Sequence, residues 1–117
     1  MTTSISSAST TAISRLQIAR YACAVGDFNP VHVDEDFALA RGLPSVIAHG
    51  PLTASLVIDL IVGQCDAAAL RSAAVRFKAP VFPGDVLTLV PTDGGADVVK
   101  ADGSPAASVV LTWAPTA

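Results

Sequence analysis

Three stretches of the chain are predicted to be helices. Residues 13–25 carry apolar side chains every three or four positions, which predicts an amphipathic helix, and Gly26 is placed to end it. Residues 34–41 begin with acidic side chains, as the first turn of a short helix favours. Residues 51–62 are apolar on nearly every side and start with Pro51, which suits the first helical position. We expect this last helix to be buried on most sides.

The second half of the chain has the two-residue period of β-strands. Apolar side chains occupy alternate positions over residues 73–78, which predicts a strand. Three further strands, separated by Asp-Gly turns, are expected over residues 86–91, 96–101 and 106–113. Helices followed by hairpin-linked strands predict an α+β fold, in which an antiparallel sheet curls around the helix of residues 51–62. Residues 1–12 are rich in Ser and Thr and form either a short strand or a loose tail.

Composition limits the class of protein. The chain has 117 residues, of which 51% are hydrophobic and 15% charged, and its net charge is -3. This length fits one domain over residues 1–117. The large apolar share argues against disorder, and the absence of a basic excess argues against a nucleic-acid partner. A surface so poor in charge suggests that another subunit covers part of it.

Two further expectations concern location and cysteine chemistry. Residues 1–12 hold no positive charge and no apolar run of the signal-peptide kind, and residues 51–62 are too few for the roughly 20 of a membrane-spanning helix. We therefore expect a cytoplasmic protein without membrane contact. Cys23 and Cys65 have no metal-ligand spacing, so we expect two free thiols buried in helices, and no metal site.

The segment of residues 26–32 contains the first candidate chemistry. It places the Asp27 carboxylate and the His32 imidazole on either side of the rigid turn Asn29-Pro30. A carboxylate and an imidazole held together are suited to proton transfer, since histidine titrates closest to neutral pH. The alternative is an ordinary polar turn, in which Asp27 only accepts a hydrogen bond from a backbone amide.

The segment of residues 47–53 contains the second group of candidate catalytic residues. Gly50 stands at the start of the helix of residues 51–62, where amides are free and the helix dipole is positive. The Gly50 amide could therefore stabilise a carbonyl oxygen that gains negative charge. The alternative is that Gly50 is a flexible entry to a core helix and that His49 packs structurally.

Three ordered motifs together resemble those of the MaoC-like family, which includes the (R)-specific enoyl-CoA hydratases. They are Gly-Asp-x-Asn-Pro-x-His at residues 26–32, Ile-Ala-His-Gly-x-Leu-Thr-Ala-Ser at residues 47–55, and Arg-Phe-x-x-Pro-Val-x-Pro-Gly-Asp at residues 76–85. The resemblance implies a hot-dog fold, in which an antiparallel sheet wraps a central helix. It also implies a homodimer, or a pseudo-dimer with two hot-dog units in one chain. Two hot-dog units must then come from two chains, because 117 residues leave room for one.

The resemblance assigns roles to four residues. Asp27 and His32 match the catalytic pair, Asn29 the turn residue that shapes the site, and Gly50 the residue whose amide polarises the thioester carbonyl. The implied reaction adds water to the β-carbon of a trans-2-enoyl thioester, or removes it from a (3R)-hydroxyacyl thioester. It needs no metal or redox cofactor, since coenzyme A or phosphopantetheine arrives as part of the substrate. Which of the pair is acid and which is base stays open.

Further residues are expected to contact the substrate. Leu52, Ile58 and Ile61 on the apolar helix would set the depth of an acyl pocket, although Ile58 stands where some relatives have Ser. One of Arg76 and Lys78 would lie near the phosphates of coenzyme A or of a carrier protein's phosphopantetheine, unless both belong to a solvated strand face. The remaining substrate-binding candidate is His49, and Asp59 on the same helix is expected at an interface or a widened pocket.

Other functions remain open on the same fold. The Asp27–His32 pair could shift a double bond, or close a ring by adding a substrate hydroxyl to an enoyl thioester. Thioester hydrolysis is another possibility, although hot-dog thioesterases do not generally carry this motif. The chain could also be one subunit of a heterodimeric dehydratase, whereas a homodimer is the simpler expectation.

Overall fold

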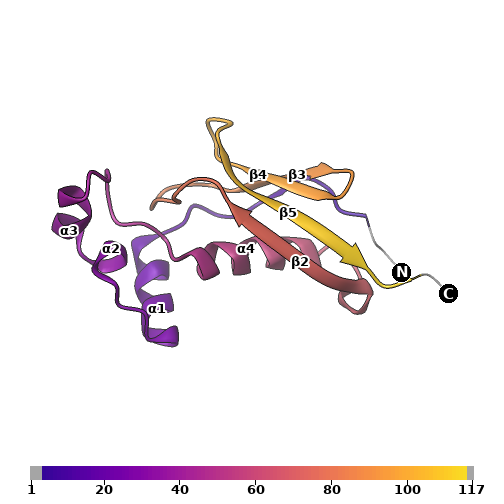
Figure 1. The fold of residues 1–117 in the computed structure, drawn as a ribbon, viewed down its shortest axis with the longest axis horizontal. Helices are drawn as coiled ribbons and strands as arrows, with labels where there is room; N and C mark the ends of the chain where they lie inside the picture. The colour runs from indigo at the N-terminus through magenta and orange to yellow at the C-terminus, as the bar shows by residue number, and fades with distance from the viewer. Residues whose placement is uncertain (1–3, 116–117) are drawn as a thin grey trace.

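The computed structural model describes residues 4–115 and contains one antiparallel sheet with strand order β1-β3-β4-β5-β2 (Figure 1). The strands are β1 (Ala8–Ser9), β2 (Leu70–Phe77), β3 (Thr88–Thr92), β4 (Gly95–Val99) and β5 (Pro105–Trp113). Every neighbouring pair is antiparallel. The prediction of an α+β fold with hairpin-linked strands is confirmed. Within residues 1–12, the short-strand alternative holds for β1, while residues 1–3 lie outside the described part.

The helices form two groups. They are α1 (Arg15–Val25), α2 (Pro30–Val33), α3 (Glu35–Ala40) and α4 (Gly50–Val62), and a 3-10 turn, η1, covers Ala67–Ala69. The helix α4 runs beneath the strands, whereas α1, α2 and α3 gather at one end of the molecule (Figure 1). A sheet that wraps one long helix is the hot-dog architecture that the sequence predicts. Between residues 4 and 115, no helix is long and apolar enough to cross a membrane.

The core lies between α4 and the inner face of the sheet. Alternate residues of β5, namely Ala107, Val109 and Leu111, point inward and are buried, as the two-residue strand period requires. From α4, Val57 and Ile61 are fully buried against this face. Only Pro51, Ser55 and Asp59 of α4 are exposed, so the expectation of burial on most sides is confirmed.

Asp59 is exposed on α4 of the single chain, so its expected place at an interface or a widened pocket stays a prediction. Two other residues lie elsewhere than predicted. Cys23 is exposed as well, because α1 turns Ile18 and Ala22 toward the core and the next position lies on another face of the helix. Cys65 is half-buried in the turn after α4 rather than in a helix. The prediction of two thiols buried in helices is therefore wrong.

A partly buried ion pair fixes the loop between β2 and β3. The Lys100 ammonium lies 3.0 Å from a carboxylate oxygen of Asp85 and donates to the Pro80 carbonyl oxygen at 2.6 Å. The same Asp85 oxygen accepts from the Phe82 amide at 2.8 Å. Only 13% of the Lys100 side chain is exposed, so solvent screens this pair less than a surface pair. The loop is thus held in one conformation.

We expect Lys100→Met to lower the free energy of unfolding by about 2 kcal/mol, because it removes two charge-assisted contacts and leaves Asp85 with a half-buried charge. Urea unfolding measures this difference. Arg15→Met is the matched control, since Arg15 pairs with Glu35 in the open, and its effect should stay within about 0.5 kcal/mol. Equal effects of the two substitutions would contradict the role given to Lys100.

Candidate active site

Gly26, Asn29 and Pro30 form the turn that positions Asp27 and His32. Gly26 ends α1 with a φ of 72°, a left-handed conformation that glycine adopts without strain. The Asp27 carboxylate then accepts from the Asn29 amide at 3.2 Å, which closes a tight turn. Asn29 caps α2 through its own side chain, and Pro30 begins that helix. The single turn of α2, which the sequence showed only as an ordered turn, carries His32.

Three hydrogen bonds join this segment to residues 47–49. The Ile47 amide donates to the Val31 carbonyl at 3.1 Å. His32 Nδ1 lies 2.7 Å from the Ile47 carbonyl oxygen, and His49 Nε2 lies 3.1 Å from the Asp27 carbonyl oxygen. Because a carbonyl oxygen only accepts, each of these ring nitrogens carries the hydrogen. His32 Nε2 is therefore the ring nitrogen left to exchange a proton with a substrate.

The carboxylate and the imidazoles form one cluster. One carboxylate oxygen of Asp27 and one ring nitrogen each of His32 and His49 lie within 4.8 Å of one another. A water that bonds at about 2.8 Å to two partners, with an angle near tetrahedral, holds them about 4.6 Å apart. Asp27 is exposed and His32 half-buried, so a water or substrate can reach the pair. The structure thus brings the predicted pair together.

These three side chains are of metal-ligating types, but their arrangement does not suit a shared ion. The rings of His32 and His49 stack with centroids 3.8 Å apart and planes 22° apart. Nitrogen lone pairs lie in the ring plane, so two stacked rings cannot both aim one at the same ion. That no metal takes part stays a prediction.

Gly50 lies beside the cluster as the first residue of α4. An amide at this position has no hydrogen-bond partner within the helix, and no main-chain oxygen of residues 4–115 accepts from it. A Cβ built on Gly50 would lie 3.3 Å from the Phe77 ring, so this ring covers the glycine closely. The third motif reaches the site here as well, because the Ala48 amide donates to the Val81 carbonyl oxygen at 2.8 Å.

A small pocket of about 200 Å³ opens next to Gly50. Its lining is mostly apolar and consists of Ile47, Ala48, Gly50, Thr53, Phe77, Ala79, Pro80 and Val81. A space of this kind suits the apolar part of a ligand whose polar end meets the Gly50 amide. Phe77 and Thr53 were not predicted as site residues. The motif at residues 76–85 includes Phe77 and was the signal that could have pointed to it.

The predicted substrate-binding residues divide into three groups. Leu52 and Ile61 belong to the hydrophobic core, and Ile58 on α4 is partly buried; none of them lines this pocket. Their role in setting the depth of an acyl pocket stays a prediction. His49 is only 1% exposed, and its contact with a substrate likewise stays a prediction.

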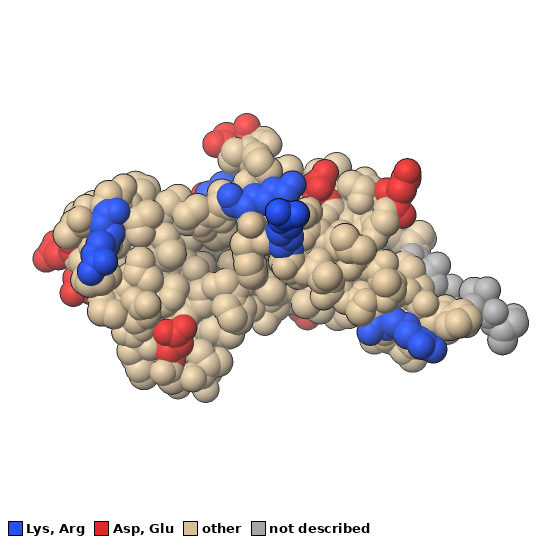
Figure 2. Space-filling model, in the orientation of Figure 1, with Lys and Arg blue, Asp and Glu red and all other residues tan. Residues whose placement is uncertain are grey.

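The basic candidates lie on the open surface. Arg76 and Lys78 are exposed on either side of Phe77 at the end of β2. Figure 2 shows basic side chains grouped near the middle of one face, in the upper part of the view. Arg76 and Lys78 flank Phe77, and Phe77 covers Gly50. A contact of either basic side chain with substrate phosphates therefore stays a prediction.

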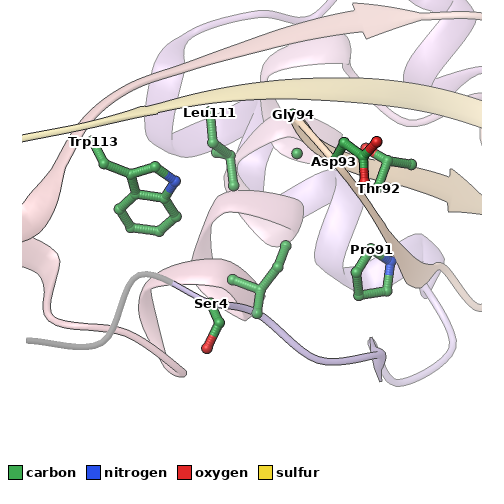
Figure 3. Close-up of a pocket in the computed structure, with 9 residues that line it drawn as sticks. Ser4, Pro91, Thr92, Asp93, Gly94, Leu111 and Trp113 are labelled. Atoms are coloured by element: carbon green, nitrogen blue, oxygen red, sulfur yellow. The ribbon is translucent and has the colours of Figure 1, made fainter.

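A larger cavity, of about 420 Å³, lies elsewhere (Figure 3). It is lined by Ser4, Ile5, Pro91, Thr92, Asp93, Gly94, Gly95, Leu111 and Trp113. None of these residues belongs to the three motifs, and none is basic. Size alone therefore does not identify the reaction site. The smaller pocket has Gly50 in its lining, although Asp27 and His32 do not line it.

Comparisons with known proteins agree with this geometry. The chain is similar to the 3-hydroxyacyl-thioester dehydratase X of Mycobacterium tuberculosis, with 38% identity over 91 residues. The match covers 78% of this chain and 29% of that protein. The structure of the (R)-hydratase from A. caviae involved in PHA biosynthesis matches with a TM-score of 0.74 and 26% identity, over 91% of this chain and 89% of that one. The ChsH1-ChsH2 complex from Mycobacterium tuberculosis shares the fold, with a TM-score of 0.77 at 18% identity, over 96% and 94% of the two chains.

The family assignment rests on a match along most of the sequence. The chain spans less than a third of the first curated relatives that it matches, namely 29%, 21% and 23% of their lengths. The family description "MaoC like domain", in contrast, matches residues 2–113. That range includes all three motifs and every residue of the site. The chain therefore belongs to the MaoC-like domain family.

Proposed function

We propose that this protein is a hydro-lyase that adds water reversibly to trans-2-enoyl thioesters and forms (3R)-hydroxyacyl thioesters. The observation that carries the proposal is the Asp27–His32 pair, with a carboxylate oxygen and a ring nitrogen within 4.8 Å, beside the free Gly50 amide at the start of α4. Membership of the MaoC-like family and similarity to a dehydratase and an (R)-hydratase support it.

The chemistry follows from these groups. A water held between Asp27 and His32 Nε2 gives up a proton as its oxygen bonds to the β-carbon of the enoyl group. The electrons of the double bond move toward the thioester oxygen, where the Gly50 amide and the positive end of α4 stabilise the developing charge. The Asp27–His32 pair, which took the proton from the water, delivers a proton to the α-carbon and so completes the addition of one water. The reverse sequence removes water, and no metal or redox group enters either direction.

We propose a coenzyme A or carrier-protein thioester as the substrate. Arg76 and Lys78 are free to meet its phosphates, while the pocket beside Gly50 takes the start of the acyl chain. That pocket, at about 200 Å³, is smaller than the roughly 300–1,000 Å³ of sites for drug-sized ligands. This size favours short acyl groups.

We propose that two copies of this chain form the working protein. The radius of gyration is 15.2 Å, against about 13 Å for a compact chain of this length, so a single chain is unusually extended. The strand β2 is an unpaired edge of the sheet, and the exposed Val110 faces outward on β5 beside it. A heterodimer is the second candidate, since the similar fold of the ChsH1-ChsH2 complex belongs to an assembly of two named chains.

The direct test is incubation of the protein with crotonyl-CoA, followed by chiral analysis of the product. We expect the (3R)-hydroxyacyl thioester. Release of free thiol instead would indicate a thioesterase, and a shifted double bond without water addition would indicate an isomerase. Sedimentation of the purified chain separates the two assemblies, because a stable homodimer argues against an obligatory partner.

A further inference from the structure

His49 is the feature that the proposed chemistry leaves unexplained. It is 1% exposed and one of two buried polar residues in the described part of the chain, the other being Thr53. Its Nδ1 is a buried nitrogen with no hydrogen-bond partner among residues 4–115. A buried polar atom without a partner costs stability. On stability alone, an apolar ring would suit this place better than an imidazole.

The contacts of His49 supply another reason for its presence. Its Nε2 donates to the Asp27 carbonyl oxygen at 3.1 Å, and its ring stacks on His32 with centroids 3.8 Å apart. A third ring, that of Tyr21 on α1, packs against it at 4.9 Å. His49 also directly precedes Gly50 in the chain. One buried imidazole therefore touches the backbone of the carboxylate residue and the face of the catalytic ring, and it adjoins the amide.

We propose that His49 is a positioning residue, which holds Asp27, His32 and the Gly50 amide in the relative positions that the reaction needs. This inference rests on the proposed hydro-lyase function. The hydrogen bond fixes where the 26–29 turn sits, and the stack fixes the plane of His32 so that its Nε2 faces the reacting water. Because His49 has no free surface, it acts through its neighbours and not on the substrate.

Two substitutions separate the two contacts. His49→Phe keeps a ring against His32 but removes the donor to Asp27, whereas His49→Gln keeps a donor in the place of Nε2 but removes the ring. We expect each to lower kcat by about 10- to 100-fold with KM changed by less than about twofold, since geometry and not substrate binding is lost. His49→Phe should also keep or raise Tm, because it removes an unpartnered buried nitrogen.

Other results would overturn the inference. A raised KM with kcat retained would mean that His49 contacts the substrate. A fall in Tm for both variants, with activity lost in proportion to unfolded protein, would mean that it only fills the core. Leu89→Val is the matched control, because Leu89 is fully buried on β3, whose strand partners are β1 and β4, so its kcat should not change.

A spectroscopic test needs no activity. The chain has only two histidines, so their ring nitrogens are readily distinguished by nitrogen NMR. With both rings neutral, we expect the hydrogen on Nδ1 of His32 and on Nε2 of His49. The Nδ1–H form of His49 would contradict the bond to Asp27 and with it the inference. If the wild type hydrates no enoyl thioester, the proposed function fails first, whereas an active wild type with unaffected His49 variants refutes only the positioning role.

Discussion

Replacing Asp27 with Asn, or His32 with Ala, is expected to lower kcat for the hydration of crotonyl-CoA by about 10²- to 10⁴-fold, the range that general acid–base groups contribute. We expect both variants to fold, and His32→Ala also loses the bond to the Ile47 carbonyl oxygen and the stack on His49. Asp27 is exposed, and an Asn there still offers an oxygen to the Asn29 amide. His32 is half-buried at the end of a single helical turn.

The size of the loss identifies the role. If Asp27 served only to close the turn, Asp27→Asn would keep nearly full activity, since the turn's hydrogen bond survives. The double variant should be little worse than the single ones, because two groups that move protons in one step act as a unit. Multiplied losses would indicate that the two side chains act independently and would contradict the shared water.

The second large effect concerns the Gly50 amide, which can be removed with a proline. Proline suits the first position of a helix, and His49 already has a ψ of 141°, the extended conformation required before proline. Gly50→Pro removes one donor to the thioester oxygen. Because Pro51 disfavours a helical backbone at the residue before it, helix content by circular dichroism must show that α4 keeps its first turn. We expect kcat to fall by about 10²- to 10³-fold, the cost of losing one such donor.

Gly50→Ala separates the loss of the amide from crowding. Its Cβ would lie 3.3 Å from the Phe77 ring, which must shift slightly, but the amide hydrogen stays. We expect a decrease in kcat/KM of at most about tenfold, with helix content by circular dichroism unchanged in both variants. Equal losses for Ala and Pro would show that space at Gly50, rather than its hydrogen, matters.

Much of the fold and of the site could be predicted from the sequence. The strand period and the Asp-Gly turns indicated the sheet, because those signals are local. Asp27, His32 and Gly50 were identified because their motifs also encode the turns that position them: Asn29 caps α2, and Pro30 begins it. The same few residues determine both the chemistry and the local backbone geometry, so the sequence predicts both.

The sequence does not show which way side chains face. Leu52 and Ile61, which we expect to set the depth of the acyl pocket, belong to the core, and that packing depends on how α4 rotates against strands far along the chain. The burial of His49 and its stack on His32 also arise only when residues 17 positions apart meet. The predicted burial of Cys23 was wrong for a similar reason, because an apolar residue at the edge of the apolar face of a helix can be either buried or exposed.

The bonds that join the two catalytic segments have a consequence for how this protein can change over generations. At Ile47 the carbonyl oxygen orients His32 and the amide meets Val31, whereas the side chain of Ile47 lines the pocket. Any residue but proline supplies the same main-chain groups. The residue at this position can thus be exchanged to admit a different acyl group while the catalytic ring keeps its anchor, and new substrate preferences can arise here without a loss of catalysis in between.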